Sequence, residues 1–342
     1  MKKVIIGLSF IFLSPSILQA QAPFYEGKTI RIVVGLPAGD VYDIYARMLA
    51  AHIGKYIAGN PNVIVQNMPG ASSMITANHV YTVGKPDGLT LGSVLPSLYF
   101  DQLVGRSEVQ FEWSKFTWLG SFERSNNLLY MRADAPYKSI HDVTKASDPA
   151  NCGSTGTGSP SYYSVRLLNE AIGTKFHIVT GYKGGQEIDL AVERGEVICR
   201  AFTVTSFFAR EPFHTWRKKG FVRVLSQTGK KRDSRLLEVP TVHELMEEYQ
   251  TPESIRRLAT LVLASGEFGR PIIATPGIPP DRVKILREAF SKTVADPGFL
   301  AEAKKQRLEV DPVTGEELET LAKDVVTARG EVIERMKKLL GN

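Results

Sequence analysis

The chain has 342 residues, of which 43% are apolar and 23% charged, and it contains two cysteines. This composition excludes a disordered chain, because the apolar side chains suffice to bury a large core, and it excludes a miniprotein held together by disulfides. At about 150 residues per domain, the length predicts roughly two domains. The formal net charge of +6 is a weak basic bias. Since no dense run of Lys and Arg is interleaved with aromatic residues, we expect no nucleic-acid partner.

The N-terminus has the pattern of a secretory signal peptide. Lys2 and Lys3 precede an apolar run over residues 4–13, and small residues follow as far as Ala20 and Ala22. A charged start, a short apolar centre and a small-residue end are typical of an exported protein. The run is shorter than the about 20 residues that span a bilayer. We therefore predict cleavage after Ala20 or Ala22 and a periplasmic mature protein; the alternative is a buried first helix.

The first part of the mature chain alternates short apolar runs with amphipathic segments. Strands are expected at residues 30–36, 63–65 and 89–94, and helices at residues 44–59 and 72–83. The order is βαβαβ, which is typical of a parallel sheet covered by helices.

A second α/β unit is expected to begin near residue 128. Its elements are a strand that ends at residue 153, a helix over 160–173, a strand at 176–180, a helix at 185–194 and strands at 197–202 and 221–225. Each of the two units has a loop of small residues that leads into a helix.

The C-terminal third is predicted to contain one strand and three helices. The strand is expected at residues 271–275, and the helices at 280–295, 297–306 and 314–340. Thr314, followed by Glu317, is a capping box that predicts the start of the last helix. Because these helices need a sheet to cover, we expect the segment to fold back onto the first unit.

This arrangement predicts an α/β protein of two open lobes with a ligand cleft between them. The first domain is then discontinuous and is joined to the second by two crossovers. The predicted divisions are a signal peptide at 1–20, domain I at 21–124 plus 262–342, and domain II at 125–261.

Two loops stand between a strand and the start of a helix, at residues 37–43 and 153–159. In open α/β sheets, ligands bind outside the carboxyl ends of the strands, where free helix amides attract anions. The alternative for the first loop is an ordinary turn in which Asp40 or Asp43 accepts the first amides of the helix. The alternative for the second loop is a flexible lead-in to its helix.

No catalytic or metal-binding motif competes with these loops. The sequence lacks a phosphate-binding loop, a G-x-S-x-G elbow and a dinucleotide fingerprint, and its six histidines are scattered without ligand spacing. We therefore expect no cofactor and no metal. Cys152 and Cys199 fall on strands that are expected to be neighbours, so a disulfide is one alternative in an oxidising compartment. We favour two separate buried thiols, because neighbouring parallel strands seldom present good disulfide geometry.

Several motifs in the same order resemble the Bug or TctC family, the extracytoplasmic solute-binding receptors of tripartite tricarboxylate transporters. The matching segments are 30–47, with its P-A-G loop, 65–71 (V-Q-N-M-P-G-A), 86–91 (P-D-G-L-T-L), 153–159 (G-S-T-G-T-G-S), 181–185 (G-Y-K-G-G), 239–241 (V-P-T) and 274–279 (A-T-P-G-I-P).

The resemblance implies a periplasmic-binding-protein fold of type II character, which closes on a small organic anion, usually a carboxylate. It implies a monomeric receptor that delivers the ligand to membrane transporter subunits and that carries out no chemistry. The ligand contacts implied by the family are Pro37, Ala38, Gly39 and Asp43 on one side and Ser154, Thr155, Gly156, Thr157, Gly158 and Ser159 on the other. Second candidates are Asn67, Tyr182, Lys183 and Gly184 with the following glycine.

One departure from the family concerns Asp40 and Tyr42, which stand where relatives commonly have glycines and a threonine. A carboxylate at Asp40 repels an anion unless it points away, caps the helix or pairs with a cationic group of the ligand. An amino-acid-like or aromatic ligand, with Tyr42 stacking on it, is therefore an alternative to a plain carboxylate. Two other functions stay open here: a secreted enzyme in which Ser159 is paired with a histidine, and a receptor that signals.

Overall fold

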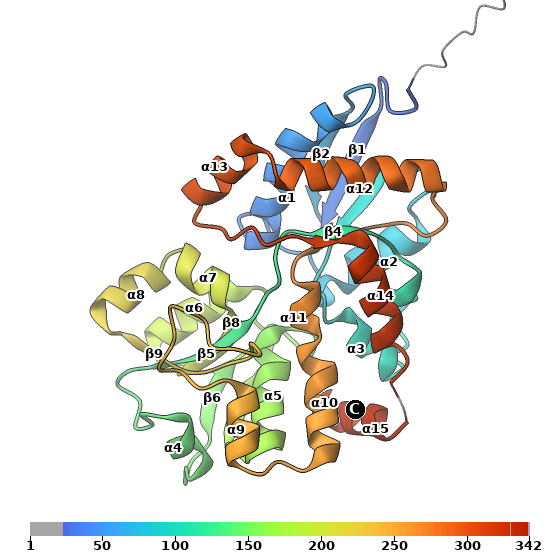
Figure 1. Cartoon of the computed structure of the whole chain (residues 1–342). Helices are drawn as coiled ribbons and strands as arrows, with labels where there is room; N and C mark the ends of the chain where they lie inside the picture. Colours follow the sequence, from blue (N-terminus) through green and yellow to red (C-terminus); the bar gives the residue numbers. More distant parts are fainter. Residues whose placement is uncertain (1–22, 329, 341–342) are drawn as a thin grey trace, which may run out of the picture.

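The computed structural model describes residues 23–328 and 330–340, so the predicted signal peptide at residues 1–20 lies outside it. The chain forms two α/β lobes, each built on its own sheet (Figure 1). We call the lobe with the six-stranded sheet lobe I and the lobe with the five-stranded sheet lobe II. The predicted two-lobed α/β fold is confirmed.

The sheet of lobe I is mixed. Its strands, in spatial order, are β11 (Val313–Thr314), β4 (Thr117–Ser121), β10 (Pro271–Ala274), β3 (Thr90–Ser93), β1 (Thr29–Val34) and β2 (Asn62–Asn67). Strand β1 pairs in parallel with β2 and β3, and β10 is antiparallel to both β3 and β4. Ile30, Ile32 and Val34, which share one face of β1, are fully buried, and so is Val33 on the opposite face.

The helices of lobe I come from both ends of the chain. They are α1 (Val41–Ile53), α2 (Met74–Thr82), α3 (Leu98–Leu103), α12 (Pro280–Val294), α13 (Pro297–Lys305) and α14 (Gly315–Val325). Helix α12 begins with a proline in its first turn, where a missing N–H costs nothing. It packs on α1 and lies across the outer part of the lobe (Figure 1). The C-terminal third therefore folds back onto the first unit as far as α14.

Lobe II has a second mixed sheet. Its strands, in spatial order, are β7 (Phe176–Val179), β6 (Ala150–Gly153), β8 (Cys199–Thr203), β5 (Asn127–Arg132) and β9 (Val222–Gln227). Its helices are α4 (Ile140–Thr144), α5 (Pro160–Ile172), α6 (Gly185–Arg194), α7 (Val204–Ala209), α8 (Phe213–Lys219), α9 (Val242–Glu248) and α10 (Glu253–Leu263). Parallel pairing joins β6 to β7 and β8, so this part is the predicted α/β unit.

The described chain passes between the lobes at three places. The first passage joins β4 to β5, and the second runs through α11 (Ser265–Phe268) into β10. The third follows α14, because α15 (Gly330–Leu340) packs on α5 and α10 of lobe II (Figure 1). Trp118 and Phe268, with ring centroids 5.2 Å apart, belong to an apolar cluster that includes side chains of both lobes.

The prediction of one long C-terminal helix over 314–340 is wrong, because α14 ends at Val325 and α15 begins at Gly330. The β-branched residues Val325, Val326 and Thr327, where α14 ends, are poor helix formers. The two halves also cover different surfaces, since α14 packs on β4 and α15 on α5. The predicted cap is present: Thr314 accepts a hydrogen bond from the backbone N–H of Glu317.

The prediction of two separate thiols is also wrong, since Cys152 and Cys199 form a disulfide. The two residues are direct partners in the parallel pairing of β6 and β8, and their Cα atoms are 4.4 Å apart. That separation lies within the range that a disulfide spans. Neighbouring parallel strands seldom present good disulfide geometry, but β6 and β8 pair at the one register position that places Cys152 directly beside Cys199.

Candidate functional site

A cavity of about 650 Å³ opens between the lobes. Lobe I contributes the loop after β1, the turn at Pro69–Ser72 and Leu95. Lobe II contributes the start of α5, the segment 182–187 and the end of β8. Arg270, from the second passage between the lobes, also lines the cavity.

Nine of the sixteen predicted site residues line this cavity. They are Pro37, Ala38, Asp40, Tyr42, Thr155, Ser159, Tyr182, Lys183 and Gly184. The cavity lining does not include the other seven, which are Gly39, Asp43, Asn67, Ser154, Gly156, Thr157 and Gly158. The structure thus brings the two predicted loops to one cavity and places part of each loop behind its surface.

Asp43 and Asn67 shape the first loop from behind. Asp43 accepts hydrogen bonds from the Gly39 N–H at 2.8 Å, from Arg47 Nε at 2.9 Å and from Asn67 Nδ2 at 2.9 Å. The same Asn67 amide donates to the Leu36 carbonyl at 3.0 Å. Burial by itself raises the pKa of Asp43, but these hydrogen bonds outweigh burial and hold the pKa below its ordinary value. Asp43 is therefore an anion that positions the loop backbone.

The turn after β2 is strained. Three successive residues that are not glycine, Ala71, Ser72 and Ser73, have φ of 43°, 53° and 75°. Left-handed backbone costs about 1–2 kcal/mol for each such residue. The turn lies against β1 so closely that a Cβ on Gly35 would be 2.5 Å from the Ser73 side chain. Strained backbone at a cavity wall is typical of a binding site, and the P-G-A motif marks this turn in the sequence.

The second loop is held by hydroxyl groups and by lobe I. Ser159 Oγ donates to the Gly156 carbonyl at 2.7 Å and lies 3.0 Å from Ser154 Oγ. From lobe I, Arg106 donates to Thr157 Oγ1 at 3.1 Å, and Ser97 donates to the Gly158 carbonyl. Residues 154 and 156–158 therefore fix the loop so that Thr155 and Ser159 face the cavity.

Asp101 supports the same loop from α3. A Cβ on Gly158 would be 3.4 Å from Asp101 Oδ2, and Asp101 pairs with Arg106 Nε at 2.8 Å. Burial raises the pKa of Asp101 to about 6, although Arg106 opposes the shift, and Glu108 adds to it. The carboxyl group is thus a titratable contact beneath the site.

Helices α1, α5 and α6 begin at the cavity, as does the six-residue α7, whose N-cap Thr203 also lines it. No side chain caps the N-terminus of α5 or α6 by a hydrogen bond. Residues of the first turn of each, Ser161 in α5 and Gln186 in α6, line the cavity. Free amides and the helix macrodipole make such N-termini favourable places for an anion.

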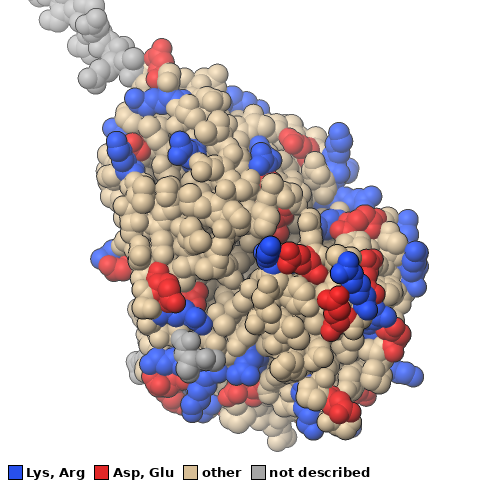
Figure 2. Space-filling view, turned by 180° about the vertical axis from the view of Figure 1, so that it is seen from behind, with Lys and Arg blue, Asp and Glu red and all other residues tan. Residues whose placement is uncertain are grey.

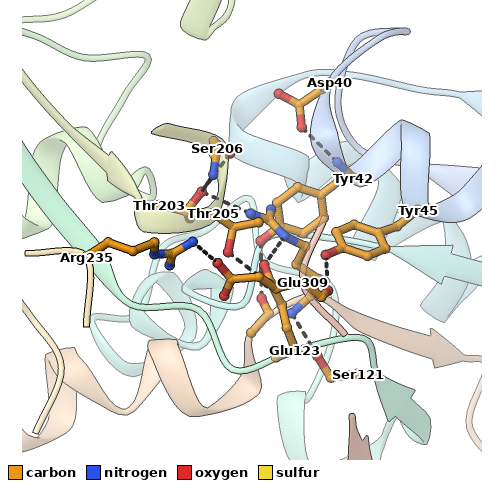
Figure 3. Close-up of polar contacts among 12 residues, drawn as sticks. Asp40, Tyr42, Tyr45, Ser121, Glu123, Thr203, Thr205, Ser206, Arg235 and Glu309 are labelled. Atoms are coloured by element: carbon orange, nitrogen blue, oxygen red, sulfur yellow. Dashed lines mark hydrogen bonds and ion pairs between the residues drawn. The ribbon is translucent and has the colours of Figure 1, made fainter. Parts of the chain in front are cut away.

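Asp40 stands both at the start of α1 and at the cavity wall. Its Oδ1 accepts from the Tyr42 N–H at 3.0 Å, so the residue caps α1, and it also lines the cavity. Figure 3 shows this bond. The Tyr42 hydroxyl donates to the Gly269 carbonyl, and the Arg270 guanidinium lies 4.8 Å from its ring centroid. The ring is therefore stacked against an arginine of the protein.

The floor of the cavity holds a buried ion pair that sequence reasoning missed. Arg270 Nε donates to Glu123 Oε1 at 2.6 Å, and the two side chains are 2% and 1% exposed. Thr205 donates to the same carboxylate at 2.8 Å, and Arg270 also donates to Thr203 Oγ1 at 2.9 Å. Figure 3 shows Glu123 among groups that come from both lobes. Burial by itself lowers the pKa of Arg270, but Glu123, together with Tyr42 and Tyr45, raises the pKa above its ordinary value.

Two further arginines of lobe II, Arg200 and Arg210, line the cavity and were also missed. A signal for Arg200 was present, because it interrupts an otherwise apolar strand, and a charge in a buried strand is rare unless it is paired. Arg210 follows α7 and gives no such signal.

On the face of the molecule drawn in Figure 2, acidic and basic side chains are interspersed, and neither kind forms a large patch of its own. Within residues 23–328 and 330–340, no helix combines the length and the apolar character needed to cross a membrane.

Two α/β lobes with an anion-favouring cavity between them define a two-lobed solute-binding protein. The chain belongs to the tripartite tricarboxylate transporter family receptors (TctC), whose sequence profile matches residues 45–338. The family consists of binding receptors, so the chain is a receptor and not an enzyme. This confirms the family resemblance seen in the sequence.

Known proteins of similar sequence and structure agree with this assignment. The UPF0065 protein in the gbd 5' region of Cupriavidus necator is 28% identical over 324 residues, which cover 93% of this chain and 90% of that protein. The periplasmic binding protein BugD has 22% identity and a TM-score of 0.69, over 92% of this chain and 98% of BugD. MatC from Rhodopseudomonas palustris, solved with bound malate, has 20% identity and a TM-score of 0.68, over 92% of this chain and 99% of MatC.

Proposed function

We propose that the protein is a periplasmic receptor that closes on a small carboxylate and delivers it to a tripartite tricarboxylate-type membrane transporter. The observation that carries this proposal is the meeting of α1, α5 and α6 at one cavity, with two of the three N-termini uncapped by side chains. The signal-like N-terminus and membership of a transporter receptor family support the location and the partner.

We assign the ligand contacts to groups on both walls of the cavity. The ligand carboxylate meets backbone amides of the loop after β1 and of the start of α5, with Thr155 and Ser159 as hydroxyl donors. The segment 182–184 closes over it from lobe II. The malate bound in MatC supports a carboxylate as the ligand class.

Calorimetric titration of the mature protein tests the proposal. Malate and other small mono- and dicarboxylates are compared with their uncharged amides, such as malamide, which keep the shape and lose the charge. We expect at least one acid to bind and its amide to bind at least about tenfold more weakly, because charge-assisted hydrogen bonds are lost. Amides that bind as tightly as the acids would contradict an anion site.

Small-angle scattering tests the closing motion. Contacts from both lobes are complete only when the lobes meet, so a saturating acid that binds should reduce the radius of gyration. The control is the same measurement with the matched amide. No compaction with a tightly bound acid would mean that the cavity is preformed.

A further inference from the structure

Arg200 and Arg210 form a pair of cations in the lobe II wall of the cavity. Arg200 projects from the central strand β8 and its side chain is 9% exposed, while Arg210 follows α7 and is 18% exposed. Both line the cavity. Buried cations in a wall need either a structural partner or a ligand.

The pair shares a single carboxylate, that of Asp189 on α6. Arg200 Nη1 donates to Asp189 Oδ1 and to the Gly185 carbonyl, the latter at 3.0 Å. Arg210 reaches the other oxygen of Asp189 with Nη2 at 3.4 Å, which is a long hydrogen bond. Two guanidinium groups are in contact with one carboxylate, so one of the two positive charges has no carboxylate of its own in contact with it.

Several donors of the pair remain unused among the described residues. The Nε atoms of Arg200 and Arg210 are buried without a hydrogen-bond partner. Neither Nη2 of Arg200 nor Nη1 of Arg210 makes a hydrogen bond to any described residue. Burial, and then the adjacent charge of Arg200, lower the pKa of Arg210. Burial by itself lowers the pKa of Arg200, but Asp189 and Tyr130 outweigh it and raise the pKa. The pair is therefore short of hydrogen-bond acceptors, and Arg210 is the less well neutralised of the two arginines.

Arg270, the third arginine of the cavity, gives a useful contrast. It has a carboxylate of its own, that of Glu123, and it donates to Thr203 as well. Its charge is thus neutralised inside the protein. Asp40 is the facing carboxylate on the lobe I wall, but no ion pair of 4 Å or less joins it to Arg200 or Arg210.

Aromatic rings hold the two guanidinium planes in place. Arg200 Cζ lies 4.5 Å from the ring centroid of Phe202, and Arg210 Cζ lies 5.4 Å from that of Phe213. A guanidinium that is stacked in this way loses little further freedom when it binds, and its fork of donors matches a carboxylate.

We propose that Arg200 and Arg210 form a subsite for a second, distal acidic group of the ligand, so that the receptor selects diacids over monoacids of equal length. This inference rests on the proposed carboxylate-binding function and specifies which carboxylates the receptor prefers. The first carboxylate lies on the helix N-termini and the loops, and the distal one accepts hydrogen bonds from Nη2 of Arg200 and Nη1 of Arg210.

The test compares matched acids on matched variants by calorimetric titration. The acids are glutarate and adipate, each set against the monoacid of the same chain length, pentanoate and hexanoate. The variants are Arg210→Gln, Arg210→Lys and the control Arg217→Gln, which removes an equal charge on α8 outside the cavity lining. Circular dichroism verifies that each variant is folded, and Arg210→Lys keeps the test valid if the glutamine variant does not fold.

We expect the wild type to bind a diacid at least about tenfold more tightly than its monoacid. Arg210→Gln should lose about tenfold for diacids and little for monoacids, Arg210→Lys should lose less, and Arg217→Gln should match the wild type. Equal losses for both kinds of acid, or no diacid preference in the wild type, would overturn the subsite and leave the proposed function intact. If no acid binds the wild type, both proposals fail.

Discussion

The two walls of the cavity are built in different ways. The lobe I wall is largely backbone: the loop after β1, positioned by Asp43 and Asn67, and a left-handed turn at Ala71–Ser73. The lobe II wall presents side chains, namely hydroxyl groups at the start of α5 and the guanidinium groups of Arg200 and Arg210. A backbone wall can bind any carboxylate, whereas a wall of charged side chains can distinguish one acid from another.

The largest loss of stability is expected from a substitution in the buried ion pair of Glu123 and Arg270, where the two walls meet. Glu123→Gln leaves a buried guanidinium without its counter-charge, which should lower the free energy of unfolding by about 3–5 kcal/mol. Urea unfolding at neutral pH measures the loss. The control is Glu334→Gln, which removes an exposed ion pair with Lys337 and should cost at most about 1 kcal/mol. Equal losses in the two variants would show that the floor is not a stabilising element.

The next largest loss of stability is expected from removal of the disulfide in lobe II. Replacing both Cys152 and Cys199 by Ala removes a crosslink between residues 47 apart in the sequence and should lower the free energy of unfolding by about 2–4 kcal/mol. Alanine is chosen because both positions are fully buried. Urea unfolding of the oxidised wild type and of the double variant gives the difference. A loss below about 0.5 kcal/mol would mean that the sheet of lobe II does not depend on the crosslink.

A third prediction concerns Asp101 of α3, which lies beneath the loop of lobe II, and the dependence of stability on pH. The pKa of Asp101 is about 6 in the folded protein, above its ordinary value of 3.8, so the folded state binds this proton more tightly. The stabilising contribution is therefore fully present below about pH 4 and is lost as the pH rises through about 6, with a size of about 2–3 kcal/mol.

Asp101→Asn removes this titration. The variant should be more stable than the wild type at pH 7.5 and should gain little at pH 4, as measured by urea unfolding across that range. Parallel curves for the two proteins would contradict a raised pKa at Asp101.

The smallest change is expected for Asp40, the acidic residue of the lobe I wall. Asp40→Gly should cost a few tenths of a kcal/mol in stability, because glycine is an acceptable N-cap. It should strengthen binding of a plain dicarboxylate by about 1 kcal/mol, since a like charge leaves the cavity. Titration of both proteins with malate and with glutamate tells whether Asp40 also recognises an ammonium group. An unchanged ratio of the two affinities would limit Asp40 to capping.

The difference between the walls also explains what the sequence could predict. The backbone wall follows from local patterns, since a P-A-G or P-G-A loop between a strand and a helix can be recognised without knowing its neighbours. Arg200, Arg210 and Arg270 come from separate elements and meet only because of how the strands are ordered. The same applies to Cys152 and Cys199, whose pairing depends on a register that no local pattern specifies. Most of the elements that were predicted lie within a few residues of the observed ones, but α3, α4, α7–α11 and the strands β4 and β11 were not predicted. The division of the last helix follows from which surfaces its halves cover.

The third passage between the lobes limits how the molecule can move. Two connections between lobes define a hinge axis about which one lobe can rotate relative to the other. Helix α15, which packs on α5 and α10 and accepts hydrogen bonds from Arg166 at its last turn, adds a third attachment. Helix α15 also touches α3 of lobe I, but its main contacts are with lobe II. A rotation that opens the cavity and carries α15 with lobe II must therefore break the contact with α3 and take up the displacement between Val325 and Gly330. The length of that short connection sets an upper bound on the angle through which the receptor can open.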